Sequence, residues 1–161
     1  VVANLFLKDR PKPRFAKDFP LSWDNVLYES PSLGYVTATH QKGIDYGPTV
    51  LTYYYPMCHE TDGRTKLFSY DWRQLADVCL TDLSRAHSDI YELTERIDIM
   101  RWGHAMISPR PNFIWSGIRE KAVKPYRKIH FAHTDLSGVA LFEEAFYHGL
   151  RAAGEVMNAR S

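Results

Sequence analysis

The sequence lacks most of the features that assign a protein to a broad structural or functional class. None of its apolar stretches approaches the roughly 18–20 residues that a membrane-spanning helix needs. Basic and acidic residues nearly balance, with 20 Lys and Arg against 19 Asp and Glu, and no run of like charge occurs. Such a chain would not concentrate nucleic acid or anionic lipid on its surface. The sequence therefore predicts no membrane span and no nucleic-acid partner.

Cysteines and familiar catalytic motifs are scarce as well. Cys58 and Cys79 lie far apart without a CxxC spacing, which favours two buried thiols in a reducing compartment over a disulfide or a metal site. No GxSxG, HExxH or Ser-His-Asp spacing occurs, so a hydrolase or zinc enzyme has little support and we expect no metal. No GxGxxG follows a predicted strand, so the motif that would hold the adenosine diphosphate of a dinucleotide is missing.

Apolar and aromatic residues are plentiful. They make up 45% and 14% of the chain, which indicates a globular protein with a large buried surface or a ligand cavity. The length of 161 residues suits one compact domain, or one domain plus part of another. The apolar start at Val1 and Val2 is typical of an interior strand, so we interpret the chain as a fragment. Localisation signals would then lie elsewhere; a cytoplasmic location is favoured, and export of the parent protein stays open.

The first two thirds of the chain contain strand-like and helical patterns. Residues 24–28, 34–39 and 49–55 are predicted short strands, and the last two are expected to form an antiparallel hairpin with a long loop. Residues 69–86 are a predicted helix with Ser69 as its N-cap. The apolar face of that helix consists of Trp72, Leu75, Ala76, Cys79, Leu80 and Leu83.

The last third predicts a strand, a polar turn and a helix. Residues 128–132 are the predicted strand. One face of the following helix carries Phe142, Ala145, Phe146, Gly149, Ala153, Val156 and Met157. The free N–H groups and the dipole at the start of such a helix can hold negative charge. The polar turn also has an explanation without a ligand, in which Ser137 or Asp135 caps the start of the helix.

Residues 131–157, with the sequence FAHTDLSGVALFEEAFYHGLRAAGEVM, resemble the C-terminal flavin-binding segment of the flavin-containing amine oxidase family. The matching pieces are Thr134-Asp135, Ser137-Gly138, Glu143 with Ala145, and Gly149 with Arg151-Ala152-Ala153. The upstream stretches SWDNVLYESPSLGYVTATHQ and RWGHAM are similar, more loosely, to the spermidine-dehydrogenase-like bacterial branch of that family. His133 departs from the family pattern, in which glycine is usual at this position.

The resemblance implies roles for individual residues around an FAD cofactor. Asp135, next to Thr134, would reach the ribityl or pyrophosphate part of FAD. Backbone N–H groups near Leu141 and Phe142, at the helix start that includes Glu143, would meet the flavin N1–C2=O edge. That edge becomes negative on reduction, so a helix start would favour hydride acceptance. FAD would bind to the full-length protein and not to this fragment alone.

The resemblance also implies a substrate cavity. Arg101-Trp102 matches an Arg-Trp pair of the family's substrate domain, and residues 97–102 are a predicted strand that places Trp102 and His104 on one face. These two residues and Tyr54 would then line the cavity. The sequence is equally compatible with another interpretation, in which Trp102 lies in the core, His104 is buried and hydrogen-bonded, and Tyr54 is an ordinary half-buried strand residue. No catalytic residue is assigned.

We therefore expect an α+β fold with two parts. Residues 1–127 would be a portion of the substrate domain, a mostly antiparallel sheet with one packed helix, and residues 128–161 the strand–helix segment of an FAD-binding domain. The expected function of the full-length protein is oxidation of a small-molecule amine by hydride transfer to flavin N5, with the isolated chain inactive. The alternatives are a desaturase-like flavoenzyme acting on an apolar substrate and a cofactor-free interaction module.

The fragment and the module predict different surfaces. A fragment would expose an apolar face along Phe142, Phe146 and Gly149, through which the chain could self-associate. A stand-alone module would close its apolar surface.

Overall fold

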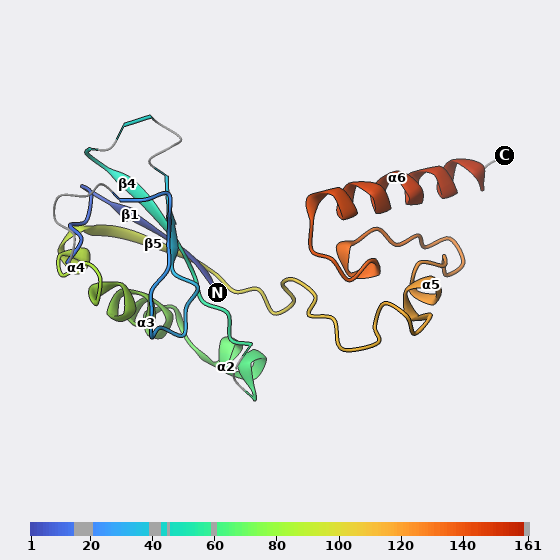
Figure 1. The fold of residues 1–161 in the computed structure, drawn as a ribbon, viewed down its shortest axis with the longest axis horizontal. Coiled ribbons are helices and arrows are strands. Elements are labelled where there is room, and N and C mark those ends of the chain that lie inside the picture. The colour runs from blue at the N-terminus through green and yellow to red at the C-terminus, as the bar shows by residue number, and fades with distance from the viewer. Residues whose placement is uncertain (15–20, 39–42, 45, 59–60, 160–161) are drawn as a thin grey trace. The chain divides into compact units, whose positions relative to one another are not determined.

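The chain forms two compact units in the computed structural model (Figure 1). The structure describes residues 1–14, 21–38, 43–44, 46–58 and 61–159. The first unit spans Val1–Gly103 and the second spans His104–Ser161, so the division lies earlier in the chain than the expected boundary after residue 127. An antiparallel sheet and separate helices make up the structure, and the α+β class expected from the sequence is confirmed.

An antiparallel five-stranded sheet forms the first unit, with the strand order β2-β3-β4-β1-β5 among the described residues. Its strands are β1 (Val2–Leu7), β2 (Asp24–Asn25), β3 (Tyr35–Thr37), β4 (Thr49–Tyr54) and β5 (Thr94–Met100). Strand β1 pairs with β4 on one side and with β5 on the other, which confirms the predicted interior strand. Tyr35 pairs with Tyr53 across β3 and β4, which confirms the predicted hairpin.

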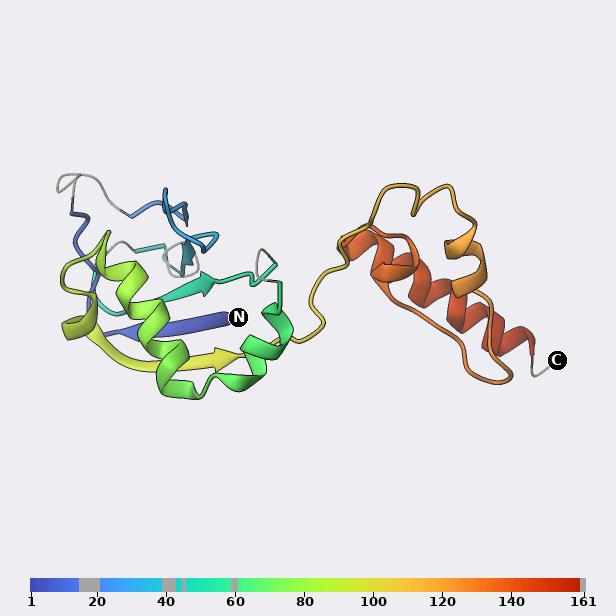
Figure 2. The same ribbon diagram turned by 90° about the horizontal axis from the view of Figure 1, so that it is seen from below.

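One face of this sheet carries the hydrophobic core. Residues alternate along β1 and β4, so that Leu5 and Leu51, which are register partners, are fully buried on the same face. Helix α3 (Trp72–Ser84) covers this face, as Figure 2 shows from below. The helix contributes Leu75 and Leu83 to the core. Fully burying a leucine stabilises a fold by about 1.5–3 kcal/mol, so these contacts account for much of the unit's stability.

Several buried polar groups of the first unit are paired with one another. The Asp82 carboxylate accepts hydrogen bonds from the Tyr53 hydroxyl at 2.8 Å and from the Ser30 hydroxyl at 2.6 Å. The Tyr35 hydroxyl lies 2.5 Å from His87 Nε2, while His87 Nδ1 lies 3.1 Å from a backbone carbonyl, which can only accept. His87 Nδ1 therefore donates and Nε2 accepts. Burial lowers the pKa of His87 and raises the pKa of Tyr53, so both stay neutral.

The predicted helix over residues 69–86 is wrong at its start. The first unit has three described helices, which are α2 (Gly63–Ser69), α3 and α4 (Ile90–Leu93). Ser69 ends α2, and its hydroxyl donates to the Lys66 carbonyl at 2.9 Å. Asp71 is the N-cap of α3, because its carboxylate accepts from the Gln74 N–H at 2.8 Å while the Gln74 side chain accepts from the Asp71 N–H at 2.9 Å. This reciprocal capping box satisfies two donors, whereas a serine cap would satisfy one.

Two predicted strands have other bounds in the structure. The strand predicted over residues 24–28 is limited to Asp24–Asn25, since a turn follows with Glu29 at a φ of 58°. Strand β5 begins three residues before the predicted range and ends before Trp102. Beyond Met100 the chain leaves the sheet. At the outer edge of β5, the indole N–H of Trp72 donates to the Ile97 carbonyl at 3.2 Å.

Helices and turns make up the second unit. It contains α5 (Ile118–Ala122), the 3₁₀ helix η1 (Thr134–Leu136) and α6 (Phe142–Asn158). The strand predicted over residues 128–132 is wrong, because only an isolated bridge between Tyr126 and Ile129 forms there, closing a turn with Arg127 at a φ of 56°. An apolar run needs a neighbouring strand to pair with, and the described residues of this unit offer none.

The two cysteines differ in environment. Both are free thiols; Cys79 is buried in the core and Cys58 is exposed, so the expectation of two buried thiols is correct only for Cys79. Burial raises the pKa of the Cys79 thiol to about 12, which leaves it protonated and unreactive. Within the part of the chain that the structure describes, no helix has both the length and the apolar character to cross a membrane.

Candidate functional site

The start of α6 is the first element of the candidate site. Leu141 is the N-cap residue, with φ and ψ of −116° and 152°, and no side chain among the described residues caps the helix. The prediction that Ser137 or Asp135 caps it is therefore wrong. Because the first turn of a helix has unpaired N–H groups, this end of α6 keeps its positive dipole end free of a capping oxygen. The N–H of Leu141 itself donates to the Val139 carbonyl at 3.0 Å, so the available donors begin at Phe142.

The predicted cofactor contacts fall on two neighbouring elements. Thr134 and Asp135 lie on η1, which packs against α6, while Phe142 and Glu143 form the first turn of α6. The Asp135 side chain is 49% exposed, and the Asp135 N–H donates to His133 Nδ1 at 3.1 Å. The Phe142 side chain is 78% exposed. The structure thus brings these residues into one unit, in which the Asp135 carboxylate is accessible.

The turn between η1 and α6 requires a glycine. Gly138 has a φ of 75°, a conformation that side chains disfavour. A Cβ atom at this position would lie 2.5 Å from the Phe113 ring, closer than packed carbon atoms approach. The Ser-Gly piece of the resembling segment therefore has a steric function in this chain, because it sets the path from η1 to the helix start.

Beneath the helix start lies a polar cluster formed by Ser137, Glu144, His148 and Arg151. The Ser137 hydroxyl donates to the Glu144 carboxylate and lies 2.7 Å from His148 Nε2. Arg151 Nε donates to His148 Nδ1 at 3.4 Å. Only 4% of His148 is exposed, and it is the one buried residue among the described residues of the second unit.

The direction of hydrogen bonding in this polar cluster excludes a nucleophilic serine. Arginine can only donate, so Nδ1 of His148 is an acceptor and Nε2 carries the proton. His148 then donates to Ser137, and Ser137 donates to Glu144. A catalytic histidine would accept the serine proton instead. Burial and the Arg151 charge lower the pKa of His148, which keeps the imidazole neutral.

The sequence did not lead us to predict this polar cluster, although the helical spacing of its residues could have indicated it. Glu144, His148, Arg151 and Glu155 follow one another at steps of four, three and four residues, which places them on one helix face. Arg151 also pairs with Glu155, and Glu155 accepts from His130 Nδ1 at 2.7 Å. These contacts lower the pKa of Glu155, with the His130 hydrogen bond as the main cause. The face of α6 that turns inward is therefore polar.

An open pocket of about 420 Å³ adjoins the polar cluster. Ser137, Glu144 and His148 form its polar wall, together with Arg119. Arg119 also ties the surrounding turns together, since its guanidinium donates to the carbonyls of Ser137 at 3.3 Å and Ile114 at 3.2 Å. The pocket lies within the size range of small-molecule sites.

The residues predicted to line a substrate cavity do not form one face. Trp102 and His104 were expected on one strand, but β5 ends at Met100 and the two residues belong to different units. Trp102 is 51% exposed and His104 is also exposed, so neither is the core residue that the alternative interpretation predicted. Tyr54 is half-buried in β4, on the sheet face opposite α3.

Neither a metal centre nor a known relative identifies the site. The described part of the chain holds no group of three or more His, Cys, Asp or Glu side chains that could bind a metal ion. No protein-family model matches the sequence, and neither curated proteins nor solved structures give a significant match.

Proposed function

We propose that residues 128–161 form the C-terminal flavin-contacting segment of an FAD-dependent oxidoreductase that oxidises an amine. The free start of α6 carries this proposal. The N–H groups from Phe142 onward are positioned to stabilise negative charge, and Asp135 on the adjacent η1 has an accessible carboxylate for ribityl hydroxyl groups. FAD, when bound, would supply the hydride-accepting chemistry.

The residues present fit such a group in the two respects that the resemblance implies. A hydrogen-bond donor set without a competing cap occurs at the helix start, and an exposed acceptor occurs seven residues earlier in the chain. In this arrangement the chain's own task would be to hold the N1–C2=O edge and to stabilise the negative charge that this edge gains on reduction. The remaining FAD contacts, including a GxGxxG unit, would come from chain outside residues 1–161.

The outer face of α6 also supports the flavoprotein over a cofactor-free module. Phe142, Phe146 and Leu150 are all exposed, and the Phe142 and Phe146 rings stack on each other with their centroids 6.2 Å apart. A closed interaction module would bury such side chains. An FAD-binding domain packed on α6 would cover them, and the small residues Gly149 and Ala153 would allow a close approach.

A matched pair of variants tests the contact in the full-length protein. Phe142→Pro removes one N–H donor at the first helical position, where proline is tolerated and where the extended Leu141 suits a following proline. Phe142→Ala removes the ring and keeps the N–H. We expect the proline variant to lower the two-electron potential of the flavin by about 30 mV, the equivalent of about 1.4 kcal/mol, and the alanine variant to leave it nearly unchanged.

The visible spectrum and the substrate profile complete the test. Full-length protein purified without a flavin absorbance band would overturn the proposal, and so would equal potentials for the two variants. Flavin reduction by amines under anaerobic conditions is the expected result. Reduction by an apolar substrate that loses hydrogen from a C–C single bond to form C=C, and not by amines, would instead establish the desaturase-like enzyme.

A further inference from the structure

The pocket beside the polar cluster is lined by charges of both signs that do not pair with each other. Its volume is about 420 Å³, and its charged side chains are Arg119, Glu120 and Glu144. Among the residues that the structure describes, no ion pair joins Arg119 to a carboxylate. We infer that this pocket binds a small aliphatic zwitterion, in which a short carbon chain joins an ammonium group to a carboxylate.

Arg119 supplies the positive charge for the carboxylate of the ligand. Its guanidinium donates one hydrogen bond each to the backbone carbonyls of Ser137 and Ile114, which fixes the planar group without neutralising its charge. These two bonds leave the Nε–H and one N–H on each terminal nitrogen without a partner among the described residues. Because a guanidinium binds a carboxylate through two parallel N–H groups, the unused donors match the two oxygens of the ligand.

Glu144 supplies the negative charge for the ammonium group. Its carboxylate accepts the hydroxyl proton of Ser137, which is a neutral donor, and it has no cationic partner in the described part of the chain. Ser137 therefore lies between the two charges, since its carbonyl accepts from Arg119 while its hydroxyl donates to Glu144. Glu120, next to Arg119 on α5, adds an exposed carboxylate to the lining.

The two fixed charges select against ligands that carry only one sign. A simple carboxylate attracted by Arg119 would also meet the carboxylates of Glu120 and Glu144, and a simple ammonium ion would meet the guanidinium. Like charges brought together in a partly dehydrated pocket repel each other strongly. The neutral His148 adds no charge that would tip this balance. A zwitterion meets an opposite charge at each end.

The remaining wall of the pocket is apolar and suits the chain between the two charged groups of the ligand. Val123, Leu136 and Val139 line it together with Tyr147. The Tyr147 ring contacts the ring of the buried His148 edge-on, with the centroids 5.2 Å apart, which holds it beside the polar cluster. A short aliphatic chain would cover part of this wall.

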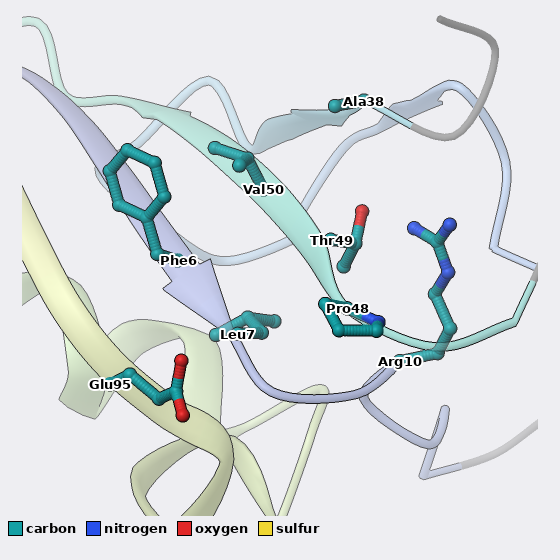
Figure 3. Close-up of a pocket in the computed structure, with 8 residues that line it drawn as sticks. All are labelled: Phe6, Leu7, Arg10, Ala38, Pro48, Thr49, Val50 and Glu95. Carbon is teal, nitrogen blue, oxygen red and sulfur yellow. The ribbon is translucent and has the colours of Figure 1, made fainter. Parts of the chain in front are cut away.

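The pocket shown in Figure 3 lacks such an arrangement. It lies in the first unit, at the end of the sheet, and has a volume of about 350 Å³. Phe6 and Val50 lie on the open face of the sheet, whereas the side chains of Leu7 and Thr49 are buried on the core face. Its lining therefore presents no single set of groups to a ligand, and its amides serve as an internal control in a binding experiment.

The inference is independent of the flavin proposal, because neither Asp135 nor Phe142 lines this pocket. It is tested with the 161-residue chain by following backbone amide NMR shifts during titration with 4-aminobutanoate at neutral pH and low ionic strength. Butanoate and butylamine, which each lack one of the two charges, are the comparison probes. We expect 4-aminobutanoate to shift the amides of Ser137, Tyr147 and His148, and each single-charge probe to bind at least about tenfold more weakly.

Variants assign the two charges. Glu144→Gln keeps an oxygen that accepts from Ser137 and removes the charge, so it should weaken 4-aminobutanoate binding about tenfold without weakening butanoate binding. Arg119→Gln should weaken 4-aminobutanoate by a similar factor without weakening butylamine. Lys121→Gln and Glu92→Gln, which remove exposed charges of the same signs outside the pocket, are the matched controls and should leave the affinity unchanged.

Each contrary result overturns the inference. These results are equal binding of 4-aminobutanoate and either single-charge probe, no shifts at Ser137 and His148, and shifts confined to Phe6 and Val50 in the first unit. Unchanged affinity in Glu144→Gln would do the same. The probe comparison and Glu144→Gln decide the matter even if Arg119→Gln disturbs the fold of the second unit, because neither removes the hydrogen bonds that Arg119 makes with the turns.

Discussion

Helix α3 of the first unit turns its apolar side chains toward the sheet, whereas α6 of the second unit turns a polar face toward the neighbouring turns. Leu75 and Leu83 lie in the hydrophobic core of the first unit. On α6 the inward residues include His148 and Arg151, and the apolar Phe142 is outside. Both helices are amphipathic, so amphipathicity alone does not tell which face a compact unit uses. The first unit is therefore stabilised by an apolar interior, whereas the second leaves the apolar face of its long helix exposed.

The largest expected effect is the loss of stability caused by a cavity in the hydrophobic core of the first unit. Leu51→Ala removes a fully buried side chain from β4 and should destabilise the first unit by about 2–5 kcal/mol. Hydrogen exchange read by mass spectrometry should show faster exchange in β1 and β4 peptides. The α6 peptides should be unaffected. Equal acceleration in both units would contradict the comparison, since it would make them one cooperative structure.

The second largest effect concerns the buried histidine. His148→Ala removes the one buried residue of the described second unit and leaves Ser137 without its histidine donor, at an expected cost of about 1–3 kcal/mol. Exchange of α6 amides should accelerate while the sheet is unchanged. Leu150→Ala, at an exposed position of the same helix, is the control and should leave α6 exchange close to that of the unaltered chain.

Acid should weaken both units. The pKa values of His87 and His148 are lowered in the folded chain, so the unfolded chain binds protons more readily as the pH falls below the ordinary value of 6.5. Stability contributed by the neutral histidines is therefore complete above pH 6.5 and is lost as the pH falls toward the folded pKa values. Hydrogen exchange measured at decreasing pH, corrected for intrinsic rates, should become faster in both α6 and β1. His148→Ala should remove the pH dependence that this residue gives to α6.

A smaller effect on stability is expected from changing the N-cap residues of α3 and α6. Asp71→Ala breaks the capping box of α3 and should cost about 1 kcal/mol. Leu141→Ser adds a cap where α6 has none among the described residues, and it should stabilise that helix by about the same amount. Thermal unfolding followed by circular dichroism measures both. Loss of α6 stability in Leu141→Ser would show that Leu141 has a packing role that the exposed helix start does not suggest.

The smallest effect is expected on the outer face of α6. Phe146→Ser should change the stability of the 161-residue chain by no more than about 0.5 kcal/mol, because the side chain is largely exposed. Urea unfolding provides the measurement. A loss comparable to that of Leu51→Ala would show that this face is already covered in solution, for example by self-association, and a concentration series would identify that case.

Strands in which apolar core residues alternate with less buried ones could be predicted from the sequence. Leu5 and Leu51 alternate with half-buried neighbours, so the strands and their hairpin could be predicted. The cap of α3 could not, since Ser69 and Asp71 are both acceptable caps and only the bond to Gln74 decides between them. The polar inward face of α6 was not predicted, for a different reason. The helical spacing of Glu144, His148 and Arg151 marks a shared face, but His148 is buried by contacts with turns that have no regular pattern, so the spacing does not show that this face turns inward.

The indole of Trp72 has a consequence for how the chain behaves in a crowded solution. Strand β5 is an edge of the sheet, and an edge can recruit a strand from another molecule and start a fibre. The Ile97 carbonyl, in the middle of that edge, is already occupied by the Trp72 N–H. Glu95, Arg96 and Asp98 add alternating charges along the same edge. An incoming strand would have to break a hydrogen bond and bury charge before it gained any pairing, which protects this edge of the sheet from templated aggregation.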